Sequence, residues 1–276
     1  MSAVALASVK ASPGVTTTAV ALGAAWPAGR QVTLVEADPA GGDLAARYGL
    51  AAEPSLLTLA AAARNQPTRA LAARHVQHLP GGLAVLVAPA SAEQTQAALG
   101  MLGPTGAVLC DVDGDVLVDA GRLDPRSATL GLVASCELLV VCARPVLAEL
   151  HHLAARVEAL RPAAAQLGVV LVGAGAYPRA EVAEALEVEV LGVLADDPGG
   201  AALLAGGAAN PRALGRLALL RGARSLAEAI CARLSAGAPP STGEPSSWPG
   251  EDAGDADATR RHATEAASAP ARAGRR

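Results

Sequence analysis

A short stretch near the N-terminus has the residue types that proteins use to hold phosphate. Residues 3–9 are small, apolar and partly β-branched, which predicts a buried strand, and an apolar run that begins at Thr16 predicts a helix. Between them Pro13 and Gly14 break the pattern, so we expect a tight loop that ends at a helix N-terminus. Backbone N–H groups and the positive end of the helix dipole favour an anion there. The stretch therefore predicts a phosphate site.

This stretch meets the usual phosphate-loop pattern, Gly-x4-Gly-Lys-Ser/Thr, only in part. Gly14 and Thr16 fill the last glycine and the hydroxyl residue, but Val15 stands at the lysine position. The backbone amides of residues 14–16 can still form a cradle, whereas Pro13 has no N–H to contribute. We predict anion binding through the backbone, without the positive charge that normally accompanies it.

The chain has 22 basic residues but a single lysine, Lys10, and this lysine lies in the same stretch. An ammonium is a compact point charge and a guanidinium is a planar fork, so the two are not interchangeable at a phosphate. Chance placement is one interpretation of the lone lysine. Its position beside the predicted phosphate loop favours a functional one.

These residues resemble the deviant motif of the ParA/MinD family of P-loop ATPases, Lys-Gly-Gly-x-Gly-Lys-Thr-Thr. The resemblance covers roughly residues 3–235, and the family's glycines are lost at positions 11 and 12. In the family, the first lysine reaches across a nucleotide-sandwiched dimer to the partner's phosphates. The resemblance thus implies ATP and Mg²⁺ as cofactors, with Thr16 on the metal. The nucleotide-binding residues it implies in this segment are Lys10, Gly14, Val15, Thr16 and Thr17.

A carboxylate follows the second predicted strand, residues 31–37. Asp38 comes at the strand's carboxyl end, where open α/β sheets bind their ligands. The family's matching motif is Asp-x-Asp-Pro, with Glu36 in place of the first Asp. The resemblance implies that Asp38 acts in catalysis, on Mg²⁺ and the attacking water. An Asx-Pro turn is the alternative, and we expect Asp43 to cap the next helix.

Two aspartates compete for the Walker B position, the carboxylate that orders the metal's water. We prefer Asp119 as the metal residue, because the segment from it to the next strand holds one short helix, as in the family. Asp111 is the alternative, and it would leave an extra strand unexplained. Gly121 can let the backbone approach a γ-phosphate.

The base-binding region is implied by the resemblance alone. The segment Leu191-Gly-Val-Leu-Ala-Asp196-Asp197-Pro198 is similar to the family loop Leu-Gly-x-Ile-Pro-Glu-Asp, against which adenine packs. Asp196 and Asp197 are therefore expected near the nucleotide. Gly173 departs from the family, which usually has an Asn there.

Strand and helix patterns alternate through the chain. This alternation predicts an α/β fold, a mostly parallel sheet flanked by helices on both faces. We expect one ParA/MinD-like domain over residues 1–235. Residues 236–276 are rich in Pro, Gly, Ser and Ala, and this composition predicts a disordered tail.

Charge and hydropathy limit the classes of binding partner that we expect. The net charge of −4 disfavours a broad nucleic-acid-binding surface, which is normally basic. The N-terminus lacks the basic region of a signal peptide, and no apolar run is long enough for a membrane segment. We expect a cytoplasmic protein. The arginines of the last predicted helix are either a solvated face or a weakly supported DNA-contacting edge: Arg216, Arg221, Arg224 and Arg233.

Two functions remain open. The resemblance implies an ATP-dependent, homodimerising switch that positions a cargo, with a protein partner from partition, division or pilus/secretion machinery. The alternative is a pseudo-ATPase scaffold that hydrolyses nothing. Val15 motivates the scaffold, because an apolar side chain cannot neutralise the β/γ-phosphates. The retained Asp38, Asp119 and Lys10 favour the switch.

Overall fold

The structure of this chain is a computed structural model that describes residues 2–10, 13–64, 69–103, 112–206 and 217–237. The alternative Walker B candidate Asp111 lies outside the described residues, as do Arg216 and almost all of the predicted tail. The last described helix runs to Gly237, so it enters the first two positions that we assigned to the tail.

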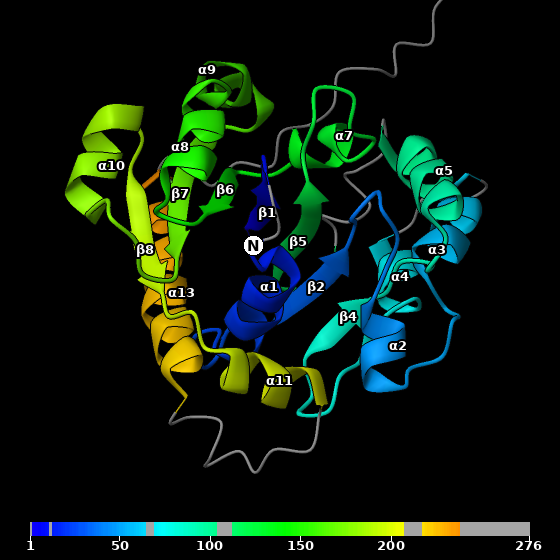
Figure 1. The fold of residues 1–276 in the computed structure, drawn as a ribbon. Coiled ribbons are helices and arrows are strands. Elements are labelled where there is room, and N and C mark those ends of the chain that lie inside the picture. The colour runs from blue at the N-terminus through cyan, green and yellow to red at the C-terminus, as the bar shows by residue number, and fades with distance from the viewer. Residues whose placement is uncertain (1, 11–12, 65–68, 104–111, 207–216, 238–276) are drawn as a thin grey trace, which may run out of the picture. The chain divides into compact units, whose positions relative to one another are not determined.

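The described residues form a sheet of eight strands in the order β3-β4-β2-β5-β1-β6-β7-β8 (Figure 1). Every neighbouring pair is parallel except β3 and β4. This confirms the predicted mostly parallel sheet. Within it, β1 lies between β5 and β6. The strands are β1 (Ala3–Ser8), β2 (Val32–Glu36), β3 (Gln77–His78), β4 (Ala84–Leu86), β5 (Asp115–Arg122), β6 (Leu138–Ala143), β7 (Gln166–Val172) and β8 (Val190–Leu194).

Helices cover both faces of the sheet, and a separate hydrophobic cluster is buried between the helices and the sheet on each face. One cluster takes side chains from α1 (Val15–Ala24), α2 (Leu44–Tyr48), α11 (Pro198–Gly206) and α13 (Ala218–Gly237). The other takes them from α3 (Leu56–Ala63), α4 (Arg69–Ala73), α5 (Ala92–Leu102), α7 (Leu130–Val133), α8 (Leu147–Ala154), α9 (Val157–Leu160) and α10 (Arg179–Leu186). A short 3-10 turn, η2 (Arg161–Ala163), follows α9.

The central strand shows how the sequence divides between these clusters. Val4 and Leu6 point to the α1 side, whereas Ala3, Ala5 and Ala7 point to the other. Successive strand residues face opposite sides, so this strand is bulky on one face and small on the other. With no phenylalanine in the chain, the largest fully buried side chains are leucines.

A buried carboxylate joins the opening segments at the amino edge of the sheet. Asp115, at the start of β5, accepts hydrogen bonds from the Ser2 backbone N–H at 3.0 Å and from Trp26 Nε1 at 2.9 Å. Arg30 binds the same carboxylate through Nε at 2.6 Å and Nη2 at 2.8 Å. These bonds tie the start of β5 to the start of β1 and to the segment that follows α1.

Three elements differ from the sequence expectation. The two-residue strand β3 is too short to carry a periodic pattern and was not predicted. Helix α11 was not predicted either. Residues 146–160, whose amphipathic pattern predicts a single helix, are divided into α8 and α9, with Arg156 as the N-cap of the second. Among the described residues, no helix is long and apolar enough to cross a membrane.

Candidate functional site

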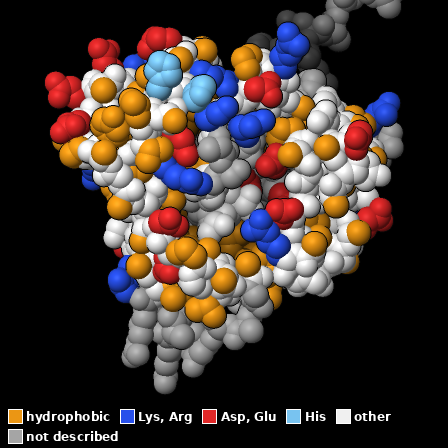
Figure 2. All heavy atoms as spheres, in the orientation of Figure 1, with side chains coloured by type: hydrophobic (Ala, Val, Ile, Leu, Met, Phe, Trp, Pro, Cys, Tyr) orange, Lys and Arg blue, Asp and Glu red, His pale blue; other side chains and the backbone are white. Residues whose placement is uncertain are grey.

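The predicted site residues of the first half of the chain meet where three parallel strands end. Strand β5 lies between β2 and β1, and Asp119 is in register with Glu36 on one side and Leu6 on the other. Helix α1 starts just beyond the end of β1. In the orientation of Figure 1, the space-filling view shows a hollow near the middle of this face, bordered by both basic and acidic side chains (Figure 2).

Helix α1 begins at a glycine. Gly14 is its N-cap in the left-handed conformation, with φ +86°, and the Thr18 N–H donates to the Gly14 carbonyl at 2.8 Å. An added Cβ on Gly14 would meet Thr17 only at 3.8 Å, so the backbone conformation, not space, requires glycine. The first turn contains no acidic residue, and its leading N–H groups have no partners within the helix. Val15 is buried in the α1-side cluster.

Asp119 is the most unusual carboxylate in the site. It is fully buried, and its Oδ1 accepts a hydrogen bond from the Gly121 N–H at 3.1 Å. Its pKa is raised to about 7, mainly by burial and also by the nearby charges of Asp38 and Glu36, whereas Thr16 and the Gly121 N–H act to lower it. Thr16 lies beside the carboxylate, but the geometry falls short of a formed hydrogen bond, because Oδ2 has no partner among the described residues.

The orphan Oδ2 atom gives a test of whether the site fits Mg²⁺. Buried carboxylate oxygens are normally satisfied, so an unpartnered one beside a hydroxyl indicates room for a ligand. Mg²⁺ prefers oxygen ligands and usually takes only one or two carboxylates, with water and phosphate oxygens completing its shell. The described residues contain no group of three His, Cys, Asp or Glu that could hold a metal. The donor set therefore fits a metal that arrives together with phosphate.

Asp38 lies against Gly121 on the neighbouring strand end. A Cβ added to Gly121, whose φ is +59°, would overlap the Asp38 carboxyl group. Asp38 Oδ1 accepts a hydrogen bond from the Ala40 N–H at 2.8 Å, which is the Asx turn considered as the alternative. Burial raises the pKa of Asp38, and the charge of Arg122 partly offsets this. The turn holds the carboxylate at the site, so the two interpretations are compatible.

Glu36 has a structural role that sequence analysis missed. Its Oε1 accepts hydrogen bonds from the N–H groups of Asp43 at 2.6 Å and Leu44 at 2.9 Å, and its Oε2 accepts one from Ala88 at 2.9 Å. Burial raises its pKa, and these three bonds oppose the rise. Glu36 therefore joins the ends of β2 and β4 to the start of α2. A glutamate at the end of a strand was the available signal.

The structure corrects the expectation that Asp43 caps the next helix. Asp43 occupies the N-cap position of α2, but its side chain makes no capping hydrogen bond. It pairs instead with Arg47 at 2.7 Å, one turn along the helix. Glu36 joins the start of α2 to the sheet by accepting from the N–H groups of Asp43 and Leu44, which are not the amides that an N-cap side chain binds.

Lys10 is exposed at the carboxyl edge of β1 and precedes two residues outside the described set.

Asp196 and Asp197, the two residues expected near the base, lie in different surroundings. Asp197 is a helix cap: its Oδ1 accepts from the Gly200 N–H at 2.8 Å and its Oδ2 from the Leu219 N–H at 3.4 Å. It therefore connects α11 to α13. Asp196 is exposed and lies beside Gly173, where an added Cβ would come within 3.2 Å of the Asp196 Cβ. The side chain of Asp197 is thus occupied by backbone amides, while Asp196 faces solvent.

The last helix presents less basic surface than its sequence indicated. Arg233 donates to Gln166 Oε1 at 2.7 Å and forms an ion pair with Glu189. Arg221 and Arg224 are exposed.

Comparisons with known proteins agree with the fold. No family model and no curated protein matches this sequence. Among solved structures, a ParA family ATPase from Chlorobium tepidum shares 14% identity at a TM-score of 0.68, over 82% of this chain and 97% of that one. The cell division ATPase MinD of Pyrococcus furiosus shares 21% at 0.69, over 84% and 99%. The septum site-determining protein MinD of Pyrococcus horikoshii, complexed with Mg-ADP, shares 19% at 0.68, over 86% and 98%.

The sheet order, the start of α1 and these likenesses together define the class of fold. The chain has the ParA/MinD type of P-loop fold, as the sequence predicted.

Proposed function

We propose that this chain is a nucleotide-dependent switch that binds Mg²⁺ and ATP at the carboxyl edge of β1, β2 and β5. The observation that carries the proposal is the buried Oδ2 of Asp119, left without a partner beside Thr16 and the start of α1. A scaffold without a ligand has no use for a buried carboxylate whose pKa burial raises to about 7. The ParA and MinD structures of the same fold support ATP as the ligand.

The residues at this edge of the sheet would each bind one part of the Mg-ATP complex or the attacking water. The amides that open α1 would hold the phosphates, and Gly14 sets the turn that aims them. Thr16 and Asp119 would hold the metal, which supplies positive charge to the phosphates. Asp38 would accept a hydrogen bond from the attacking water, because it lies at the same strand edge and the Ala40 amide fixes its orientation. Lys10 would contact phosphate of a second copy, since it is exposed at this edge.

A positioning role follows from this switch. We propose that ATP binding joins two copies and that the dimer engages a cytoplasmic protein partner from partition, division or pilus/secretion machinery. Nucleic acid receives less support as a partner, because Arg233 is engaged within the domain. The pseudo-ATPase scaffold remains the second candidate, and the specific observation that favours it is Val15, whose side chain is buried in the core instead of facing phosphate.

The experiment is calorimetric titration of the full chain with ATP, with and without Mg²⁺, while light scattering follows its mass. We expect Mg²⁺-dependent binding and conversion to a dimer, both weakened in Asp119→Asn. Exposed Glu184→Gln is the matched control and should bind as the unmodified chain does. ATP binding without hydrolysis, followed in a separate turnover assay, would favour the scaffold. No binding at millimolar ATP would exclude the switch.

A further inference from the structure

The proposed nucleotide site contains more acidic than basic side chains. Glu36, Asp38 and Asp119 are close enough that each of the first two raises the pKa of the third. Val15 brings no charge at the position where a lysine is usual. ATP is itself a polyanion, and these three acids add negative charge beside its phosphates. Besides the metal and Lys10, a further positive side chain from the same protomer would offset this charge.

Arg122 is a basic residue at the edge of this site. It is the last residue of β5, directly after Gly121, whose backbone lies against the Asp38 carboxyl group. Across the sheet Arg122 is in register with Ser8, and the Leu123 N–H donates to the Ser8 carbonyl at 2.8 Å. Its backbone is therefore fixed beside the end of the strand that leads into the phosphate loop.

The charge of Arg122 already acts on this site. The pKa of Asp38 is raised mainly by burial, and Arg122 is a cation that pulls it back. Arg122 is exposed, and within the described part of the chain its side chain has no ion pair or hydrogen bond. It is thus available to a ligand at the edge of the site.

Neighbouring arginines are engaged in the structure itself. Arg144, at the end of β6, interacts with the buried Glu149 through both its backbone and its side chain. Arg156 donates from Nη1 to the Leu123 carbonyl at 2.6 Å, which holds the residue next to Arg122 in place.

We propose that Arg122 binds the nucleotide phosphates within its own protomer and replaces the phosphate-loop lysine lost at Val15. This inference rests on the proposed nucleotide site. A guanidinium can form two parallel hydrogen bonds to phosphate, so it can serve from the strand next to β1, although a lysine would normally act from the loop.

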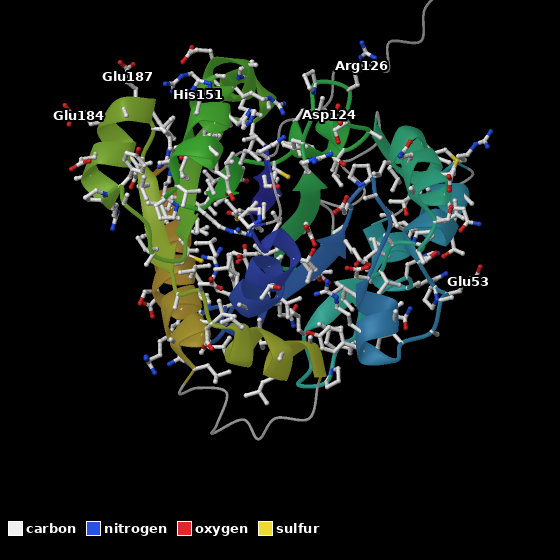
Figure 3. The ribbon with its side chains drawn as sticks, in the orientation of Figure 1. Glu53, Asp124, Arg126, His151, Glu184 and Glu187 are labelled. Atoms are coloured by element: carbon white, nitrogen blue, oxygen red, sulfur yellow. The ribbon has the colours of Figure 1, made fainter. Side chains whose placement is uncertain are left out.

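The test is the affinity of the full chain for Mg-ATP, and for adenosine as a phosphate-free probe, by calorimetry. We expect Arg122→Gln to weaken Mg-ATP binding about ten- to a hundredfold, which is the loss expected for hydrogen bonds between charged groups. Adenosine binding should not change, and Arg122→Lys should keep part of the affinity. The matched control is Arg126→Gln, because Arg126 is an exposed arginine on the loop after the same strand and points away from the body of the domain (Figure 3).

A second variant tests the replacement directly. Val15→Lys restores the usual lysine, and in that background Arg122→Gln should cost much less affinity than in the native chain. Thermal melting establishes whether Val15→Lys folds, since Val15 is buried; if it does not, the Arg122→Lys, Arg122→Gln and Arg126→Gln comparison decides alone. If the native chain binds Mg-ATP and Arg122→Gln binds it equally well, Arg122 has no phosphate role. If the native chain does not bind, the proposed function itself fails.

Discussion

The backbone of Gly121 lies directly against the carboxyl group of Asp38, so that a Cβ on Gly121 would overlap it. The two residues come from the ends of neighbouring parallel strands. This contact brings one acid of the site within reach of the strand that carries the other, Asp119. The arrangement can be tested through the glycine, the acids and the hydrogen bonds that support them.

Gly121→Ala should destabilise the domain more than a positive φ alone explains. Gly49 provides the control, because its φ of +62° is close to the +59° of Gly121 and an added Cβ there would meet nothing within 4 Å. We expect Gly49→Ala to cost about 1–2 kcal/mol of unfolding free energy and Gly121→Ala about 2–4 kcal/mol, measured by urea denaturation. Adding Asp38→Ala should recover part of the difference. Equal costs for the two glycines would contradict the contact.

The stability of the ligand-free protein should fall as the pH rises from about 4 to about 7. The pKa of Asp119 is raised by burial from 3.8 to about 7, so the folded state keeps a proton that the unfolded chain releases. Unfolding therefore releases a proton in this window, and the free energy of unfolding decreases with pH before levelling off above it. Asp119→Asn removes this titration and should be more stable than the native chain at pH 8, by up to about 4 kcal/mol.

Urea denaturation of both proteins at pH 5, 6, 7 and 8 measures this difference. The comparison cancels the contributions of Glu36 and Asp38, whose pKa values are also raised by burial. A difference between the two proteins that is independent of pH would contradict a raised pKa for Asp119.

Glu36→Gln should destabilise the domain by about 1–3 kcal/mol, because an amide N–H₂ would face backbone N–H groups that now donate to a carboxylate. Glu36→Asp restores the residue of the family motif, but its shorter side chain should lose contact with either Ala88 or the start of α2. Exposed Glu184, on α10, is the control, and Glu184→Gln should be neutral (Figure 3). Hydrogen exchange of the Leu44 and Ala88 amides would show which bonds are lost; unchanged protection in Glu36→Gln would be inconsistent with this role.

Asp115→Asn should cost about 3–5 kcal/mol, since it leaves the Arg30 guanidinium without its buried counter-charge. The exposed Asp43–Arg47 pair has a similar distance, 2.7 Å, and Arg47→Gln should cost less than about 1 kcal/mol. Thermal and chemical denaturation measure both. Similar small costs for the two variants would mean that Asp115 does not anchor the amino edge of the sheet.

The sequence by itself determined the sheet, the break between the first strand and the first helix, and the acids at the strand ends. These depend on local information: apolar runs of strand length, Pro13 and Gly14 after the first of them, and carboxylates directly after the second and at the fifth. The position of Asp38 at a strand end followed from the pattern of strands, whereas the choice of Asp119 over Asp111 depended on the resemblance to the family. The lone lysine was likewise visible from composition alone.

Only the tertiary structure decided how these residues are held and charged. Glu36 reaches Ala88, 52 residues away, and Asp115 reaches Trp26 across 89, distances in sequence over which no local pattern carries information. The same is true of the approach of Gly121 to Asp38 and of the register between Arg122 and Ser8, which require β5 to insert between β1 and β2. Asp115 and Asp119 are both buried, but packing gives Asp115 the Arg30 guanidinium as a partner and leaves Oδ2 of Asp119 with none among the described residues.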